Sequence, residues 1–266
     1  MTKPSRDGYR IPSPPSAAHM AAAHTLLAPW RAVTRPIFTG MDNLPERGPV
    51  LVVANHTLYG GLDVPMILDH VYRERAISLR VLGDHVHDLV PGWRDLLRSY
   101  AMVPGNPAVG RALMAAGAHV LVFPGGAREV NKRKGQKYQL LWGERVGFAK
   151  LAQQTRATIV PMASVGGDDV YDIVVDADTA VLKPLNDLLR RAFGRDDIFV
   201  PLGRGIGPTP IPKPQQFHIS FGTPIAAGDY GTDQIADLRN DVRLALQAQI
   251  ARLLSDRNTS TKGAQT

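Results

Sequence analysis

Short apolar runs that alternate with helix-like segments are the feature that most constrains the fold of this chain. Residues 50–54, 119–123 and 157–162 are dominated by apolar side chains and have the length of buried strands. Between them lie longer segments with apolar residues at helical spacing, such as 109–116 and 145–154. Strands that alternate with helices indicate an α/β fold with a largely parallel central sheet flanked by helices.

Size and composition favour one large domain. The chain has 266 residues, of which 44% are hydrophobic and 21% charged, enough for a substantial core. It contains 0 Cys, which excludes disulfides, thiolate nucleophiles and Cys-ligated zinc and fits a reducing compartment. We expect a domain over residues 37–254, preceded by a disordered tail (1–15) and a helix (16–36) and followed by a disordered tail (255–266).

The charge balance favours anionic partners. The formal net charge is +7 and the sequence pI is about 9.8. Only 6% of residues are aromatic, and no interleaved basic-aromatic pattern, zinc-finger signature or RNA-recognition signature occurs, so we expect no nucleic-acid partner. No stretch approaches the ~20 apolar residues of a spanning helix, and none has the pattern of a signal peptide. We therefore expect peripheral contact with the cytoplasmic face of a membrane and no transmembrane span.

Two segments have the pattern of membrane-facing helices. In residues 16–36, basic residues Arg31 and Arg35 follow an apolar face, which suits an amphipathic helix lying in a membrane interface. A helix packed on the domain's own core fits the same pattern. Residues 185–195 combine a leucine stripe with arginines, and suit a membrane-facing helix, an active-site cover or an ordinary core helix. The apolar face of the first segment consists of Met20, Ala23, Leu27 and Trp30.

A polar motif follows the first buried run. Asn55 and His56 end the strand, two glycines follow, and Asp63 and Pro65 open a helix-like segment. A His at the end of a buried strand lies at the carboxyl edge of the sheet, where α/β folds place their chemistry. A nearby carboxylate can fix the imidazole tautomer, so that His56 takes a proton from a hydroxyl. Asp63 and Pro65 equally suit an N-cap and a first helical turn, and His56 an ordinary strand end.

A second polar motif, residues 123–129, follows the buried run that begins at residue 119 and reads Phe-Pro-Gly-Gly-Ala-Arg-Glu. It opens a dense basic cluster that either binds phosphates or forms a solvated basic loop. Backbone amides of Gly125 and Gly126 are candidate donors to an oxyanion, because glycine lets the backbone approach a substrate closely. The cluster consists of Arg128, Lys132, Arg133, Lys134 and Lys137.

Two clusters are candidates for cation binding. His85 and His87 alternate as they would on one face of a strand, a spacing seen among metal ligands, and Asp88 follows. A solvated loop is the favoured interpretation, because a metal site needs three well-placed ligands. Asp168 and Asp169 suit either a cation or, more commonly, a turn. We therefore predict no metal site.

The ordered set of Asn55-His56 with Asp63, then Phe123 to Glu129, then Ile159-Val160-Pro161, resembles the glycerolipid acyltransferase superfamily. The likeness is nearest to its diacylglycerol-acyltransferase-like and phytyl-ester-synthase-like branch. Two departures stand out. Six residues separate His56 from Asp63 where the family usually has four, and Gly125 replaces the family's Glu, which favours neutral alcohols over phosphorylated acceptors.

This resemblance implies a glycerol-phosphate-acyltransferase-like fold and transfer of a fatty acyl group from acyl-CoA or acyl carrier protein to a lipid hydroxyl, without a resident cofactor. His56 is then the general base and Asp63 its partner. The implied substrate-binding residues are Asn55, Gly125, Gly126, Arg128, Glu129, Lys132 and Lys134. A metal-dependent hydrolase, a non-catalytic protein that binds anionic lipid and, on charge alone, a nucleic-acid binder remain as alternatives.

Overall fold

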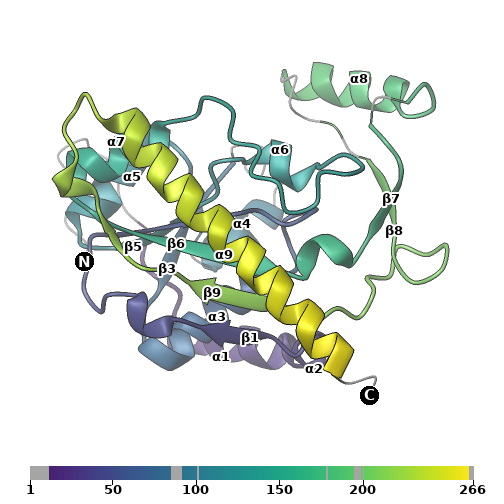
Figure 1. Ribbon diagram of the computed structural model, residues 1–266, viewed down its shortest axis with the longest axis horizontal. Coiled ribbons are helices and arrows are strands. Elements are labelled where there is room, and N and C mark those ends of the chain that lie inside the picture. Colours follow the sequence, from purple (N-terminus) through teal and green to yellow (C-terminus); the bar gives the residue numbers. More distant parts are fainter. Residues whose placement is uncertain are drawn as a thin grey trace.

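The computed structural model describes residues 12–84, 92–100, 102–177, 179–194, 199 and 201–263. These residues form a central sheet covered by helices on both faces, and a small two-stranded sheet stands apart at one end (Figure 1). The α/β fold predicted from the sequence is confirmed.

The described residues build a central sheet of eight strands in the order β1-β9-β6-β2-β5-β3-β4, with β10 paired to β6. Its middle is parallel, as predicted, because β2 pairs in parallel with both β5 and β6, and β3 with both β4 and β5. At the other edge β9 runs antiparallel to β6. The strands are β1 (Ile37–Thr39), β2 (Val50–Ala54), β3 (Leu79–Gly83), β4 (Met102–Pro104), β5 (His119–Val122), β6 (Thr158–Val165), β9 (His218–Phe221) and β10 (Ile225–Ala226).

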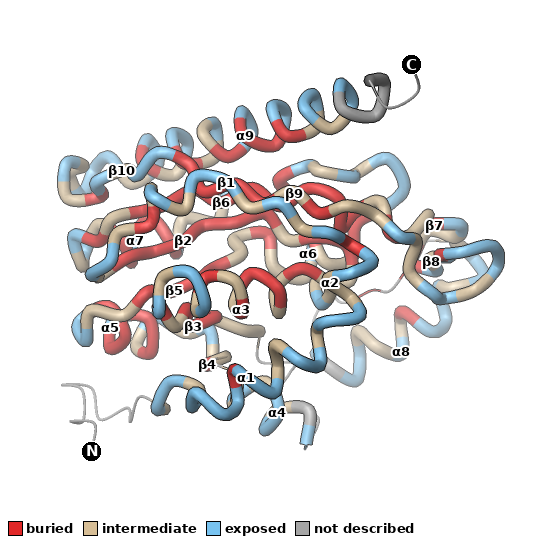
Figure 2. The backbone as a smooth tube through the Cα atoms, turned by 90° about the horizontal axis from the view of Figure 1, so that it is seen from below, coloured by how far each residue is buried: buried red, intermediate tan, exposed pale blue. Residues whose placement is uncertain are grey.

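Helices bury the two faces of this sheet in separate clusters. Side chains of α5, α7 and α9 pack with Leu51 and Val53 on one face, and side chains of α3 pack with Val50 and Val52 on the other. Figure 2 shows the buried strands β2, β6 and β9 between α9 and α3. The helices are α1 (Ala17–Leu26), α2 (Ala28–Thr34), α3 (Val64–Arg75), α4 (Trp93–Ser99), α5 (Pro107–Ala115), α6 (Ala127–Val130), α7 (Gly147–Thr155), α8 (Lys183–Phe193) and α9 (Ile235–Gly263), with short 3₁₀ turns η1 (Met41–Asn43), η3 (Gly167–Asp169) and η4 (Ala227–Asp229).

The N-terminal segment, predicted as one helix over residues 16–36, is divided into α1 and α2. His24 Nδ1 and Arg31 Nη1 both contact the buried carboxylate of Asp69 on α3, at 2.8 and 3.2 Å. Trp30 donates a hydrogen bond to the carbonyl oxygen of Leu62 (2.9 Å). These contacts favour packing on the domain, and an interfacial position for this segment stays a prediction. No helix in the described residues has both the length and the apolar character needed to cross a bilayer.

The C-terminal segment differs from the expectation of a disordered tail over residues 255–266. Helix α9 continues to Gly263. Arg257 donates to the carboxylate of Asp169 at 2.7 Å, which ties the late turns of the helix to the turn after β6. The disordered tail was predicted because Ser255 and the residues after it are mostly polar. Composition alone does not reveal an ion pair with a residue that is distant in the sequence.

Candidate active site

The position of His56 is set by the ends of two parallel strands. Asn55, at the end of β2, donates its side-chain amide to the carbonyl oxygen of Ser164 on β6 (2.9 Å) and accepts from the Ser164 amide (2.8 Å). Asn55 is 1% exposed, so its side chain joins the strands rather than facing a substrate. The next residue, His56, leaves the sheet at its carboxyl edge and is half-buried.

The two sequence motifs meet at the His56 ring. The imidazole stacks on the ring of Phe123, with centroids 4.0 Å apart and planes inclined by 20°. Gly60 lies close to the Cε1–Nε2 edge of the imidazole. A Cβ atom on residue 60 would come within 2.5 Å of Cε1 and 3.0 Å of Nε2. Gly60 has a φ of +62°, a conformation that favours glycine. The loop therefore closes around the ring only because residue 60 has no side chain.

The peptide groups on either side of His56 are held by buried charged side chains. The His56 amide donates to Glu129 Oε2 at 2.7 Å, and the His56 carbonyl oxygen accepts from Lys132 Nζ at 2.7 Å. The other Glu129 oxygen accepts from the Leu141 amide at 2.9 Å. Glu129 is 0% exposed. Glu129 was expected to bind substrate; its contacts instead fix the backbone that carries the imidazole.

Lys132 has a different place from the one the basic cluster suggested. Its side chain is 1% exposed and its ammonium contacts both oxygens of Asp168, at 2.7 and 3.0 Å. Asp168, 0% exposed, also accepts from the backbone amides of Leu58 and Tyr138, each at 2.7 Å. The expectation that Lys132 gathers substrate phosphates is corrected by this burial, because a buried ammonium saturated by a carboxylate does not reach a solvent-borne phosphate.

Gly125 and Glu129 share one space. A Cβ atom on Gly125 would lie 2.2 Å from the Glu129 carboxyl carbon, which is far below any van der Waals contact. The absence of a side chain at residue 125 therefore leaves the room that Glu129 fills. Burial raises the pKa of Glu129 to about 7, against the hydrogen bond from the His56 amide and the charge of Lys132, which lower it. The collision with Glu129 therefore explains why residue 125 is Gly here, where the family motif has Glu.

Asp63 is fully buried where α3 begins. One carboxylate oxygen accepts from Thr57 Oγ1 (2.9 Å) and from the Val64 amide (3.0 Å), and the other accepts from Ser164 Oγ (2.6 Å). In the described part of the chain these are its hydrogen-bond donors, and His56 is not among them. Burial raises the pKa of Asp63, and the bonds from Ser164 and Thr57 oppose that rise. Asp63 thus joins the His56 loop to β6 and to the first turn of α3.

The Pro-Gly-Gly turn is held by a residue that the sequence analysis did not single out. Arg145 donates to the carbonyl oxygens of Pro124 (3.1 Å) and Gly125 (2.7 Å). The Gly126 amide donates to the Phe123 carbonyl oxygen at 3.0 Å, so in this state it closes the turn. Arg145 stands at the start of a helix-like segment, and nothing in its local sequence indicates this contact.

The exposed cations lie outside this buried network. Arg128, on α6, is exposed, and its guanidinium lies over Gly143, where a Cβ atom would be 2.8 Å from Nη1. Lys134 is exposed too, and its backbone amide donates to Asp176 at 2.9 Å. Three cations were expected to bind substrate. The side chains of Arg128 and Lys134 are exposed, whereas that of Lys132 is buried.

The candidate metal ligands His85, His87 and Asp88 lie outside the described residues. Within the described ranges no group of three or more His, Cys, Asp or Glu side chains is placed to hold a metal ion. The acidic pair after β6 contacts cations of the chain itself, because Asp168 binds Lys132 and Asp169 binds Lys137 (3.0 Å) and Arg257.

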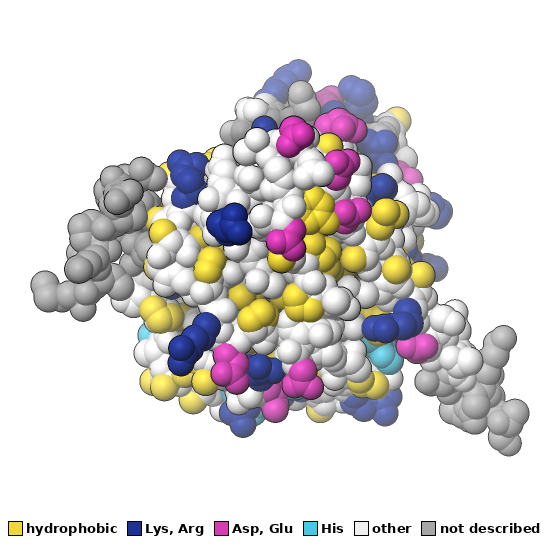
Figure 3. Space-filling view, turned by 60° about the vertical axis from the view of Figure 1, so that its left-hand side comes forward, with side chains coloured by type: hydrophobic (Ala, Val, Ile, Leu, Met, Phe, Trp, Pro, Cys, Tyr) yellow, Lys and Arg dark blue, Asp and Glu magenta, His cyan; other side chains and the backbone are white. Residues whose placement is uncertain are grey.

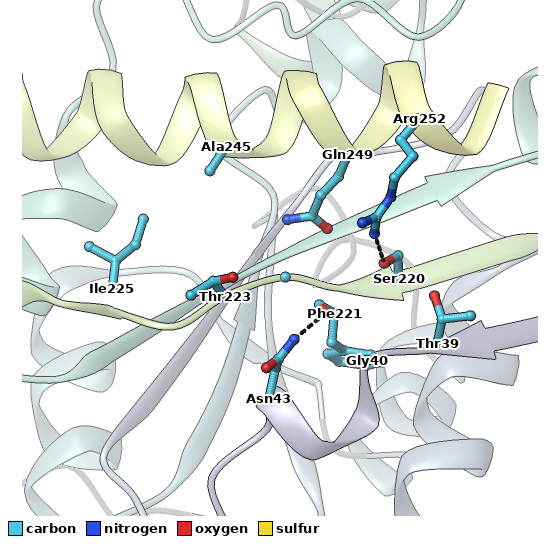
Figure 4. A pocket seen from close by; sticks show the side chains of 11 residues that line it. Thr39, Gly40, Asn43, Ser220, Phe221, Thr223, Ile225, Ala245, Gln249 and Arg252 are labelled. Atoms are coloured by element: carbon cyan, nitrogen blue, oxygen red, sulfur yellow. Dashed lines mark hydrogen bonds between the residues drawn. The ribbon is translucent and has the colours of Figure 1, made fainter. Parts of the chain in front are cut away.

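A pocket of about 560 Å³ lies away from this network, between α9 and the turn that follows β9 (Figure 4). Gln249 and Arg252 point into it from α9, and Asn43 faces them from η1. Neither His56 nor Asp63 lines it. The pocket is therefore a separate hollow at the sheet edge.

Comparison with known proteins agrees with the motifs and the fold. Residues 35–165 match the family model described as Acyltransferase, and this part of the chain belongs to that family. It contains both motifs that meet at the His56 ring.

Two relatives cover more of the chain. A Mycobacterium leprae protein of uncharacterized function is 34% identical over 230 residues, which are 82% of this chain and 60% of that protein. Phytyl ester synthase 2, chloroplastic, of Arabidopsis thaliana is 32% identical over 213 residues, 71% of this chain and 29% of that protein. The chain therefore spans only part of the length of these relatives.

A solved structure shares the fold. The crystal structure of the 1-acyl-sn-glycerophosphate (LPA) acyltransferase, PlsC, from Thermotoga maritima superposes with a TM-score of 0.54 over 88% of this chain and 82% of that one. Because the sequence identity is 16%, this likeness concerns the architecture alone.

Proposed function

We propose that this protein transfers a fatty acyl group from a thioester donor to the hydroxyl of a lipid acceptor, with His56 as the general base. The observation that carries the proposal is the stacking of the His56 ring on Phe123, because it joins the two acyltransferase motifs at the carboxyl edge of the sheet. The family match of residues 35–165 supports the same reaction class.

The chemistry follows from one half-buried imidazole at the carboxyl edge of the sheet. His56 takes the proton of the acceptor hydroxyl as its oxygen attacks the thioester carbonyl carbon. The C–O bond forms, the C–S bond breaks, and the imidazolium returns the proton to the leaving thiolate. Rigid placement of the base is worth several kcal/mol in such a step. Glu129 and Lys132 supply that rigidity here by holding both peptide groups of His56.

Asp63 supports His56 through the loop that it anchors. Its hydrogen bonds reach Thr57, directly after His56, and Ser164 on the neighbouring strand. We propose that Asp63 positions His56 in this way.

Donor and acceptor classes follow from the exposed cations and from Gly125. Arg128 and Lys134 suit the phosphates of acyl-CoA or of an acyl carrier protein's prosthetic arm. With Glu129 filling the space beside Gly125, we propose a neutral long-chain alcohol or diacylglycerol hydroxyl as the acceptor. The relation to phytyl ester synthase 2, whose name denotes an ester of a long-chain alcohol, supports this choice.

The direct test is product analysis with labelled acyl-CoA and a panel of alcohols, diacylglycerol and lysophosphatidate. The wild-type protein is expected to form a labelled ester, and His56→Ala is expected to lose it while keeping its melting temperature. The matched control is His19→Ala, which removes an exposed imidazole far along the sequence from the motif. A folded His56→Ala variant with wild-type turnover would remove His56 from the mechanism, and absence of any labelled ester would contradict the reaction class.

A further inference from the structure

Exposed apolar side chains are concentrated in one part of the fold. We call it the arm: residues 172–177, 179–194 and 201–211, which contain β7 (Asp172–Val175), α8 and β8 (Leu202–Arg204). Of the twelve large apolar side chains that are exposed in the described part of the chain, seven belong to the arm. They are Val174, Val181, Leu185, Leu188, Leu202, Ile206 and Ile211.

The arm has little core of its own. β7 and β8 form a two-stranded antiparallel sheet that is separate from the central sheet. α8 lies beyond them at the outer end of the molecule (Figure 1), and Figure 2 shows these segments mostly exposed or intermediate. Among the side chains of α8 that the structure describes, the buried one is the polar Asn186, which donates to the Ala177 carbonyl oxygen at 2.8 Å. The helix is therefore fixed by a polar contact, while Leu185 and Leu188 are 50% and 63% exposed.

The arm is attached to the loop that carries His56. Tyr59, three residues after His56, donates its hydroxyl to the Pro201 carbonyl oxygen at 2.9 Å. Its ring packs edge-on against Tyr171 with centroids 5.2 Å apart, and its amide donates to the Val130 carbonyl oxygen. The apolar surface thus begins beside the loop where a lipid hydroxyl must arrive.

Basic side chains border the arm. Arg191 is exposed near the end of α8, and Arg133 lies over the ring of Phe199 with its guanidinium carbon 5.3 Å from the centroid. The amide of the exposed Lys134 bonds to Asp176, next to β7. Figure 3 shows a different face, where Lys and Arg side chains are interspersed with Asp and Glu. Apolar side chains bordered by cations match an anionic bilayer surface, whose headgroups attract the cations while the acyl region accepts the leucines.

We infer that the arm docks this protein on an anionic lipid bilayer and presents the His56 loop to acceptors held there. We take the bilayer itself as the binding partner, since Leu185 and Leu188 are exposed one turn apart on α8 and the neighbouring loop carries the exposed cations Arg133 and Lys134. The second half of the inference rests on the proposed function; the docking does not.

Vesicle co-sedimentation tests the docking. The probes are phosphatidylcholine vesicles with and without phosphatidylglycerol, and the variant is L185S/L188S. We expect its partitioning to fall on the order of 10- to 100-fold, as the loss of two inserted leucines implies. The matched control is L96S/L244S, which removes two leucines that are 48% and 62% exposed outside the arm and outside the N-terminal segment, and is expected to bind as the wild type does. R190Q/R191Q is expected to weaken binding to the anionic vesicles more than to the neutral ones.

Equal vesicle binding by L185S/L188S and the wild type, with both folded by circular dichroism, would overturn the inference. So would a wild-type dimer that L185S/L188S dissociates without loss of vesicle binding, because the arm would then be an interface between two copies. Transfer to a short-chain, water-soluble alcohol needs no bilayer and is measured in parallel. Absence of transfer to every acceptor, water-soluble and lipid alike, contradicts the proposed function, while vesicle binding alone decides the docking.

Discussion

Replacing Glu129 by Gln gives the sharpest test of how the His56 loop is held. In the structure both carboxylate oxygens of Glu129 accept hydrogen bonds from backbone amides, those of His56 and Leu141. A Gln side chain offers one oxygen and one NH₂ group, so in either orientation a buried amide faces a donor. An unsatisfied buried donor costs about 1–3 kcal/mol.

The same substitution removes a titratable group, and the sign of its pH effect is fixed by the direction of the shift. The pKa of Glu129 is raised from 4.5 to about 7 by burial. The neutral form is therefore favoured in the fold, and its stabilisation is fully present below the unfolded-state pKa and is lost as the pH rises through the folded-state pKa. A shift of this size corresponds to roughly 3 kcal/mol at 1.36 kcal/mol per unit.

Urea denaturation of wild type and Glu129→Gln, from about pH 4.5 to about pH 8, measures both terms. The variant is expected to be about 1–3 kcal/mol less stable at the acidic end. The wild type's loss of roughly 3 kcal/mol toward the alkaline end is expected to close or reverse this difference, since only the wild type loses stability through this group. Glu144→Gln, at an exposed carboxylate, is the matched control and should keep the wild-type pH profile. Parallel pH profiles for wild type and Glu129→Gln would refute the reasoning.

Three further outcomes are expected. Gly60→Ala should reduce kcat on the order of 10²-fold by displacing the imidazole, whereas Gly61→Ala, whose Cβ would meet no atom closer than 3.7 Å, should stay near wild type in the same assay; equal losses would discount the ring contact. Asp63→Asn puts an NH₂ group in place of one oxygen that accepts from Thr57, Val64 or Ser164, so it should loosen the His56 loop and slow single-turnover transfer on the order of 10²-fold, and a near-normal rate in the folded variant would argue against this positioning role. Lys132→Met should cost about 3–5 kcal/mol in thermal unfolding by leaving the Asp168 carboxylate unpaired, and adding Asp168→Asn should recover part of it; no recovery would argue against the buried pair.

Much of the sheet was predictable because buried parallel strands are short apolar runs. The runs at 50–54, 119–123 and 157–162 correspond to β2, β5 and β6, and their parallel pairing confirms the predicted fold class. The strands β1, β7, β8 and β10 were missed. Each is two to four residues long and lies partly exposed, so none contains an apolar run of more than three residues.

The inner contacts of the site were less predictable than its position. The two motifs placed His56 and Phe123 in the right region, but the direction of each side chain depends on partners far along the chain. Lys132 stands in a basic run that has the pattern of a solvated loop, yet its partner Asp168 is 36 residues away and buries it. Arg145 and the pairing of Glu129 with the His56 amide likewise carry no local signal.

The shared space of Gly125 and Glu129 has a consequence for variation in this chain. A carboxylate can be supplied from either position, but the two side chains do not fit together, because a single added carbon on residue 125 already collides with Glu129. A glutamate introduced at residue 125 is tolerated only alongside a small residue at 129. Large side chains at the two sites are thus mutually exclusive, and a library that varies residue 125 alone will reject a glutamate that a small residue at 129 would admit.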